Sequence, residues 1–266
     1  MKSASSNVAF SCRTKSEHME ACMTPDSQLA QVISLSDKRL VKDVPNLHMA
    51  PHMGSAILRD ALPDAPFDAA ATGFVLACLP DSKDPVLWIQ DRMSRRENGR
   101  LYGPALRRFG FNGHILRVEV SHPRDVLWAM EEGASCAGLS AVVGEIHGAP
   151  EVLSFTATKR LALRAESSGV PLWLIRSGDH GALSAARERW RLRSVPSGPN
   201  RYNAQAPGTP MWEADLFRAR GLAPGVWTAS YDGAAGRSTD RLSLLPRSGD
   251  GALAADHRPA SHAPGG

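Results

Sequence analysis

Four short apolar runs, separated by segments with helical patterning, are the feature that most constrains how this chain can fold. The runs cover residues 86–90, 115–120, 139–146 and 170–175. A strand that is apolar on both faces must be covered on both faces, which is typical of parallel sheets with helical crossovers. Pro123 and Phe155 begin the clearest of the intervening helices. The sequence therefore predicts an α/β fold with a doubly wound, mainly parallel sheet.

The second half of the chain changes pattern. Residues 190–195, 211–217 and 226–231 resemble strands joined by turns that contain Pro and Gly, without helices between them. These strands are expected to extend the sheet in antiparallel fashion. Residues 1–52 carry no sustained period and are expected to be poorly ordered. The predicted α/β domain covers residues 53–232, followed by a disordered tail over 233–266, where Gly, Ala, Ser, Arg and Pro dominate.

Composition and cysteine usage indicate a cytoplasmic protein. Hydrophobic residues make up 42% and charged residues 22%, as expected of a globular chain that buries a core. The four cysteines form no C-x-x-C pair, and the segments around Cys78 and Cys136 resemble buried ones, which favours reduced, unreactive thiols. Neither a membrane span nor the apolar core of a signal peptide is evident, so no membrane association is expected.

A phosphate-binding loop of the form G-x-x-x-x-G-K-[ST] is missing from the sequence. The segment before the predicted helix 68–79 has neither Gly nor Lys, and its Asp64 would repel phosphate. We therefore expect no ATP hydrolysis, no cofactor and no metal, and predict that the chain is not an enzyme. Glu145 is a weak candidate for a nucleotide or metal ligand, because it ends an apolar strand where phosphate-loop proteins place an acidic group. The alternative is a polar strand end.

Arginines alternate along the segment that follows the fourth apolar run. Residues 151–220 hold eleven Lys or Arg against six Asp or Glu, in a chain of net charge +4. In a strand, Arg187, Arg189, Arg191 and Arg193 would share one face, and Trp190 would point to the other. Such a face, with Trp190 beside it, could bind DNA phosphates or an acidic protein surface, or could simply be the solvated face of an edge strand. Charge reversal at Arg189 and Arg191 is expected to weaken binding without unfolding.

A second group of arginines lies in the predicted loop after the first apolar run. The group consists of Arg92, Arg95, Arg96 and Arg100. Because ligands of doubly wound sheets bind beyond the carboxyl ends of the strands, this loop is a candidate partner-binding or DNA-binding element. The alternative is a solvated loop.

The order of several segments resembles the ImuA family. The sequence Gly-Arg-Leu-Tyr-Gly-Pro-Ala-Leu at residues 99–106 is similar to the turn that follows the family's first strand. The other matching segments are residues 85–89, 125–132, 141–145, 158–163, 171–176, 189–192 and 212–221. Together they cover roughly residues 68–232, and their joint order is more specific than any one motif.

The resemblance implies a RecA-like fold, related to the division inhibitor SulA, and a role in the bacterial SOS response to DNA damage. Family members act in error-prone translesion synthesis with ImuB, an inactive Y-family polymerase relative, and with an error-prone replicative-type DNA polymerase. The missing phosphate loop fits a non-catalytic adaptor that binds these partners and DNA. Three alternatives stay open: a SulA-like cell-division inhibitor, a RecA-like ATP-dependent DNA-binding protein with a degenerate nucleotide site, and a DNA-binding module that acts alone.

Overall fold

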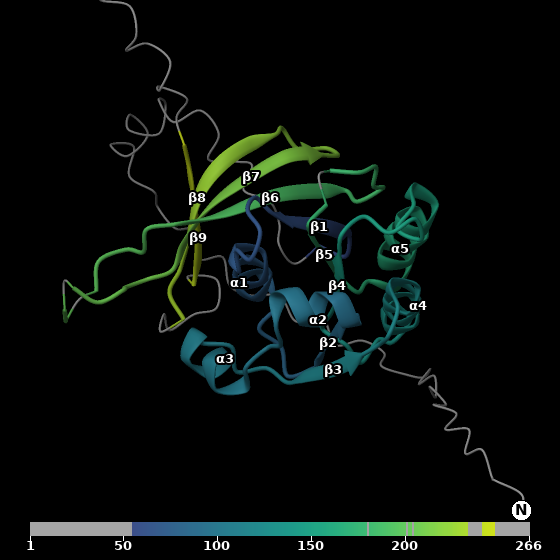
Figure 1. Ribbon diagram of the computed structural model, residues 1–266, viewed down its shortest axis with the longest axis horizontal. Helices are drawn as coiled ribbons and strands as arrows, with labels where there is room; N and C mark the ends of the chain where they lie inside the picture. Colours follow the sequence, from purple (N-terminus) through teal and green to yellow (C-terminus); the bar gives the residue numbers. More distant parts are fainter. Residues whose placement is uncertain (1–54, 180, 201, 204, 234–240, 248–266) are drawn as a thin grey trace, which may run out of the picture. The chain divides into compact units, whose positions relative to one another are not determined.

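The protein folds around one sheet, which the computed structural model describes for residues 55–179, 181–200, 202–203, 205–233 and 241–247 (Figure 1). Within these residues the sheet has nine strands in the order β3-β2-β4-β5-β1-β6-β7-β8-β9. The strands are β1 (Leu58–Pro63), β2 (Val86–Gln90), β3 (Ile115–Glu119), β4 (Ala141–His147), β5 (Leu172–Ser177), β6 (Glu188–Val195), β7 (Met211–Ala219), β8 (Gly225–Tyr231) and β9 (Leu242–Pro246). The helices are α1 (Ala70–Cys78), α2 (Arg92–Asn98), α3 (Gly103–Phe109), α4 (Pro123–Ala134) and α5 (Phe155–Ser168). The N-terminal segment 1–52, expected to be poorly ordered, lies outside the described residues.

Six neighbouring strands, from β3 to β6 in the sheet order, all run parallel. The helices α1, α4 and α5 each lie between two of these strands in the chain, as helical crossovers require. The prediction of an α/β fold with a mainly parallel sheet is therefore confirmed, and so are the four strands placed by the apolar runs.

The central strand β1 was not predicted, because its sequence is partly charged. Arg59 and Asp60 are fully buried within it. The Arg59 guanidinium donates to the Glu188 carboxylate over 2.8 Å, and Asp60 accepts from Arg176 over 2.9 Å. Buried charges are tolerated when each has a partner of opposite sign. Those partners come from β5 and β6 on either side, so β1 could not be recognised from its own residues.

The strands β7, β8 and β9 continue the sheet beyond β6 in antiparallel fashion. The three strands predicted in the second half of the chain correspond to β6, β7 and β8; β6 pairs parallel with β1, and the antiparallel extension begins between β6 and β7, as expected. The strand β9 is a correction, because it lies in the region expected to be a disordered tail. It pairs with β8 along its length, and its Leu242 and Leu244 pack against the core.

Helices cover the two faces of the parallel part of the sheet (Figure 1). On one face, Phe74 of α1 packs among Trp173, Trp190 and Trp212, with ring centroids 5.3–6.2 Å apart. On the other face, α4 and α5 pack against alternate residues of β4 and β5. Here α4 approaches β4 so closely that a Cβ on Gly144 would lie 2.3 Å from the sulfur of Met130. A larger residue at position 144 would therefore force the Met130 side chain to move.

The arginine-rich segment after β2 is the helix α2, whereas a loop was predicted. Asp91 caps the helix by accepting a hydrogen bond from the backbone N–H of Ser94 over 2.7 Å. Gly99, with φ of 78°, follows its last turn. A seven-residue helix with one buried side chain, Ser94, has too little apolar periodicity to be detected from sequence.

The two described cysteines differ in their surroundings. Cys78 is buried as expected, and burial raises the pKa of its thiol far above the ordinary range. Cys136 is exposed, which corrects the expectation of a second buried thiol. No helix in the described ranges is long and apolar enough to cross a membrane.

Candidate functional site

The loop between β1 and α1 occupies the position where a phosphate-binding loop would lie. It comprises residues 64–69, and its Asp68 carboxylate turns back onto the helix that follows. One carboxylate oxygen accepts from the backbone N–H of Ala70 over 2.9 Å, and both bind Ser194 of β6, through its backbone N–H and its hydroxyl. The first amide of α1, which a phosphate would otherwise approach, is thus already bound to a carboxylate.

Beside this loop lies a hollow of about 310 Å³ that is acidic in character. Its lining includes Asp64, Asp68, Glu97 and Asp179, and none of its described lining residues is Lys or Arg. Carboxylates repel phosphate and raise the cost of bringing it into a partly enclosed space. The arrangement therefore supports the expectation that this edge of the sheet does not bind the phosphates of a nucleotide.

Glu145 lies inside β4, which continues to His147, and not at the strand end where we expected it. Its side chain is buried, and one carboxylate oxygen accepts a hydrogen bond from the indole N–H of Trp88 over 2.5 Å. Burial raises the pKa of Glu145, although the hydrogen bond from Trp88 and the nearby amides of Gln90 and Asn98 oppose this effect. No cluster of three potential metal-binding side chains occurs among the described residues, so nothing here assembles a metal site around it.

The arginines of β6 alternate as predicted, but only part of the set is accessible. Trp190 and Leu192 point into the core on the α1 face, whereas Arg191 and Arg193 are exposed on the other face. Arg189 also points away from Trp190, yet it is buried, and it donates to the Asp60 carboxylate over 3.1 Å. The structure thus buries Arg189 and Trp190, which were predicted to lie on a partner-contacting surface.

The exposed arginines of β6 are paired with acids of β7. Arg191 lies 3.4 Å from the Asp215 carboxylate, and Arg193 lies 2.7 Å from that of Glu213. A register shift leaves Phe217 as an extra residue on β7, and its ring lies under the guanidinium groups of Arg189 and Arg191. These pairs partly neutralise the arginine face that was predicted to bind a partner.

The second predicted arginine group lies on and after α2, and three of its members are in ion pairs. Arg95 and Arg100 both bind the Glu119 carboxylate at the end of β3, at 3.4 and 2.8 Å. Arg96 lies 3.5 Å from its neighbour Glu97. Arg92, Arg96 and Arg100 are exposed, and Arg95 is half-buried. A helix therefore carries this group where a loop was expected, and Glu119 holds two of its guanidinium groups.

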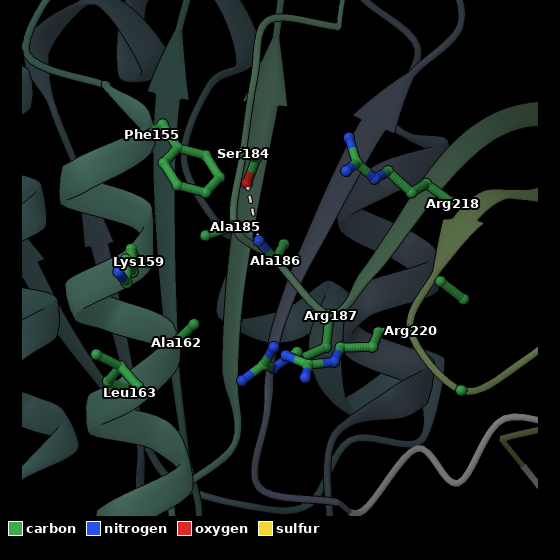
Figure 2. A pocket seen from close by; sticks show the side chains of 12 residues that line it. Phe155, Lys159, Ala162, Leu163, Ser184, Ala185, Ala186, Arg187, Arg218 and Arg220 are labelled. Carbon is green, nitrogen blue, oxygen red and sulfur yellow. Dashed lines mark hydrogen bonds between the residues drawn. The ribbon is translucent and has the colours of Figure 1, made fainter.

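A basic groove of about 680 Å³ lies between α5 and the adjoining ends of β6 and β7 (Figure 2). We use the name basic groove for the hollow whose cationic lining residues are Lys159, Arg187, Arg218 and Arg220. Its floor is made largely of alanines, and Phe155 and Leu163 of α5 stand half-exposed along one side. The groove therefore combines positive charge with apolar surface.

Electrostatics inside the basic groove favour an anionic ligand. Arg187 forms an ion pair with Glu166 of α5, which raises the pKa of Arg187 and lowers that of Glu166. Arg220 is close enough to contribute to the low pKa of Glu166. With four cationic side chains and one neighbouring acid, the groove keeps an excess of positive charge.

Of the predicted site residues, Arg187 alone lines the basic groove, and Lys159, Arg218 and Arg220 were missed. The signals available were the Arg-Ala-Arg sequence at residues 218–220 and the spacing of four between Phe155, Lys159 and Leu163, which places these three on one helical face. These signals come from segments far apart in the chain, and only the fold brings them together.

Comparison with known proteins identifies two relatives. No family model matches the chain. Protein ImuA from Caulobacter vibrioides strain NA1000 / CB15N is 29% identical over 153 residues, which cover 53% of this chain. Protein ImuA from the strain ATCC 19089 / CIP 103742 / CB 15 matches with the same identity and coverage. The chain spans 58% of the length of these curated relatives.

Proposed function

This chain is a relative of the ImuA proteins, and from that premise we propose that it acts in the DNA-damage response as a non-catalytic RecA-like adaptor. In this role it serves SOS-induced, error-prone translesion synthesis. It binds an ImuB-like, inactive Y-family polymerase relative and an error-prone replicative-type polymerase, and it contacts DNA. The relationship supports the theme of damage and mutagenesis, and the order of the parallel strands is compatible with the RecA-like fold that the resemblance implies.

The observation that carries the adaptor role is the basic groove. A surface hollow with four cationic side chains and an apolar floor suits an acidic protein segment or a nucleic-acid backbone. The position of the missing phosphate loop is acidic instead, which supports binding without nucleotide-driven chemistry. The function therefore rests on the groove and not on a catalytic centre.

The structure changes which arginines should be tested. Reversing the charge of Arg189 would place a carboxylate beside the buried Asp60, so the variant would unfold for reasons unrelated to binding. Arg218 and Arg220 are exposed and line the basic groove. Their joint replacement, R218E/R220E, removes positive charge from the groove while leaving the buried core intact.

Arg124 and Arg164 are exposed arginines outside the groove lining. The variant R124E/R164E makes the same change in net charge and serves as a matched control.

The test in cells measures the frequency of ultraviolet-induced mutation in a strain deleted for this gene. We expect the wild-type gene and R124E/R164E to restore mutation, and R218E/R220E to restore it at least about tenfold less, because a lost charged hydrogen bond weakens binding by that order. Both variants must retain the thermal stability of the wild type. A deletion strain with normal induced mutation would contradict the proposal. Filamentation on overexpression together with FtsZ binding would then favour the division-inhibitor alternative.

A test in solution separates DNA from protein as the groove's ligand. Fluorescence anisotropy with a labelled single-stranded 20-mer measures affinity across a range of salt concentrations. If the groove binds phosphates, R218E/R220E should weaken binding and reduce the slope of log affinity against log salt by roughly 0.7 for each phosphate that is no longer neutralised. If the wild type and R218E/R220E bind DNA equally, the groove is not the DNA site, and an acidic protein segment becomes its candidate ligand.

A further inference from the structure

A second cavity, of about 300 Å³, lies between α1, the connection from α2 to α3, and the sheet. We name it the Glu145 cavity. Its walls are mostly apolar, with Leu76, Leu101, Leu106 and Phe109 among them, and its polar members include Gln90, Asn98 and Glu145. It shares only Asn98 with the acidic hollow beside the β1–α1 loop and no residue with the basic groove.

The carboxylate in this cavity is only partly satisfied. Glu145 is 1% exposed, and while its Oε1 binds the Trp88 indole, its buried Oε2 accepts no direct hydrogen bond from the described residues. The amides of Gln90 and Asn98 lie near enough to favour the charged form of the carboxyl. Each amide donates one recorded hydrogen bond elsewhere, Gln90 to the carbonyl of Gly99 and Asn98 to the hydroxyl of Ser177, and neither donates to Oε2. One acceptor oxygen therefore stands at an apolar cavity without a direct donor.

Three of the other buried acids have a cationic partner, which Glu145 lacks among the described residues. Asp60 is bound by Arg176 and Arg189, Glu188 by Arg59, and Asp179 by Arg176. Asp91 resembles Glu145 instead, because it accepts the capping hydrogen bond of α2 with one oxygen and its other oxygen is buried without a hydrogen bond from the described residues. The charge that acts most directly on Glu145 is Asp91, which has the same sign. Arg100 also lines the cavity, but its guanidinium is bound to Glu119. A buried carboxylate without a cation of its own is unfavourable, so the cavity is suited to a ligand that supplies one.

We propose that the Glu145 cavity binds a guanidinium group, presented as an arginine side chain by a partner protein, with Glu145 as its acceptor. A guanidinium is planar and carries five N–H donors, so it can bind Oε2 and the amide oxygens of Gln90 and Asn98 together. Its alkyl stem then lies against the apolar walls. The choice of a partner's arginine over a free compound rests on the proposed adaptor function, whereas the affinity of the cavity for guanidinium does not.

Calorimetric titration of the full chain with benzamidinium tests the cavity itself. Benzamidinium offers a planar amidinium on an apolar ring, and benzamide is a neutral compound of the same shape. We expect benzamidinium to bind the wild type and the control E151Q, which changes an exposed acid. Its affinity for E145Q should be at least about tenfold lower, because a charge-assisted hydrogen bond is lost. Benzamide should bind all three proteins weakly and equally. Equal binding of benzamidinium to the wild type and E145Q would overturn the proposal, as would no binding at all.

The source of the guanidinium is tested with a short blocked peptide, acetyl-Gly-Arg-Gly-amide, titrated alone and in competition with benzamidinium. We expect the peptide to bind, to displace benzamidinium, and to lose affinity in E145Q. The same peptide with citrulline in place of arginine should not bind, because citrulline has the same shape without the charge. If benzamidinium binds but the arginine peptide does not, the partner's arginine is refuted while the site remains. Neither result depends on damage-induced mutation, so a failure here is distinguishable from a failure of the adaptor role.

Thermal stability against pH shows whether E145Q is folded and whether Glu145 ionises in place. Burial raises the pKa of Glu145, so this group's contribution to stability is present at low pH and is lost as the pH rises through the raised pKa. The charged groups near it are Asp91 and the Arg100 of the cavity lining, and Tyr102 is also titratable. We expect E145Q to match the wild type near pH 4 and to melt higher at pH 8, while benzamidinium binds the wild type more tightly at pH 8. Tighter binding at pH 4 would contradict a carboxylate acceptor.

Discussion

Asp60 is the residue on which the centre of the sheet depends. One of its carboxylate oxygens accepts from Arg176 over 2.9 Å and from Arg189 over 3.1 Å. All three side chains are almost wholly buried, and they belong to three neighbouring strands. Such a group holds β1, β5 and β6 together only while it is complete, because a buried charge that loses its partner keeps its full cost of desolvation.

The replacement Asp60→Asn is therefore expected to lower the free energy of unfolding by about 3–5 kcal/mol, since two buried guanidinium groups lose their shared carboxylate. Urea denaturation followed by circular dichroism measures the change. The control Arg193→Gln breaks the half-exposed pair with Glu213 and should cost about 1 kcal/mol or less. Similar small losses for both variants would show that the Asp60 group does not hold the sheet together.

At the scale of elements, the loop between β1 and α1 contains a strained residue. Phe67 has φ of 60°, the only positive φ of a non-glycine residue in the described part of the chain. Its ring is 79% exposed, so packing of the ring does not explain the conformation. A left-handed backbone costs a residue with a Cβ on the order of 1–2 kcal/mol. The hydrogen bonds of Asp68 to Ala70 and Ser194 hold the adjoining backbone in place.

We expect Phe67→Gly to raise the free energy of unfolding by about 1 kcal/mol, because glycine adopts a positive φ without steric cost, although its unfolded state is more flexible. Phe67→Ala removes the ring but keeps the strain, so its stability should stay close to that of the wild type. Comparison of the two melting curves isolates the backbone term. If alanine stabilises as much as glycine, the gain comes from removing an exposed ring and not from relief of strain.

The accuracy of sequence interpretation also differs between elements. The strands β2, β4 and β5 were found because their apolar runs record burial on both faces. The strand β1 was missed because its charged residues are neutralised by neighbouring strands. The helix α2 was missed because it has no apolar periodicity, and the cap residue Asp91 alone is too weak a signal. The alternation along β6 was found, but the burial of Arg189 was not, because Asp60 lies 129 residues away in the chain.

At the scale of the whole described sheet, the acidic hollow and the basic groove lie at opposite ends of the neighbouring strands β1 and β6. The acidic β1–α1 loop follows the carboxyl end of β1, whereas Arg187 of the basic groove precedes the amino end of the neighbouring parallel strand β6. This placement favours an anionic ligand at the basic groove over the acidic β1–α1 loop.

This distribution predicts that millimolar MgATP leaves the melting temperature of the protein unchanged, because ligands stabilise only when they bind the folded state. Differential scanning fluorimetry measures the effect, with a phosphate-loop ATPase as the positive control. A rise in melting temperature with MgATP would favour the alternative of a degenerate but functional nucleotide site. Loss of that rise in E145Q would then place the nucleotide next to β4.

The sequence by itself determined the α/β class, the four apolar strands, the antiparallel extension, the absence of a phosphate-loop motif from the chain and the resemblance to ImuA. The strands can be predicted from consecutive residues, because burial on one or both faces of an element leaves a local periodicity. The missing motif and the resemblance can be seen directly in the identities and order of the residues. The tertiary structure alone decided the position of β1, the burial of Arg189 and Trp190, the basic groove and the Glu145 cavity. These features depend on charged residues and cavity-lining residues from segments that are distant in the chain. No local sequence pattern predicts which of these segments will be in contact.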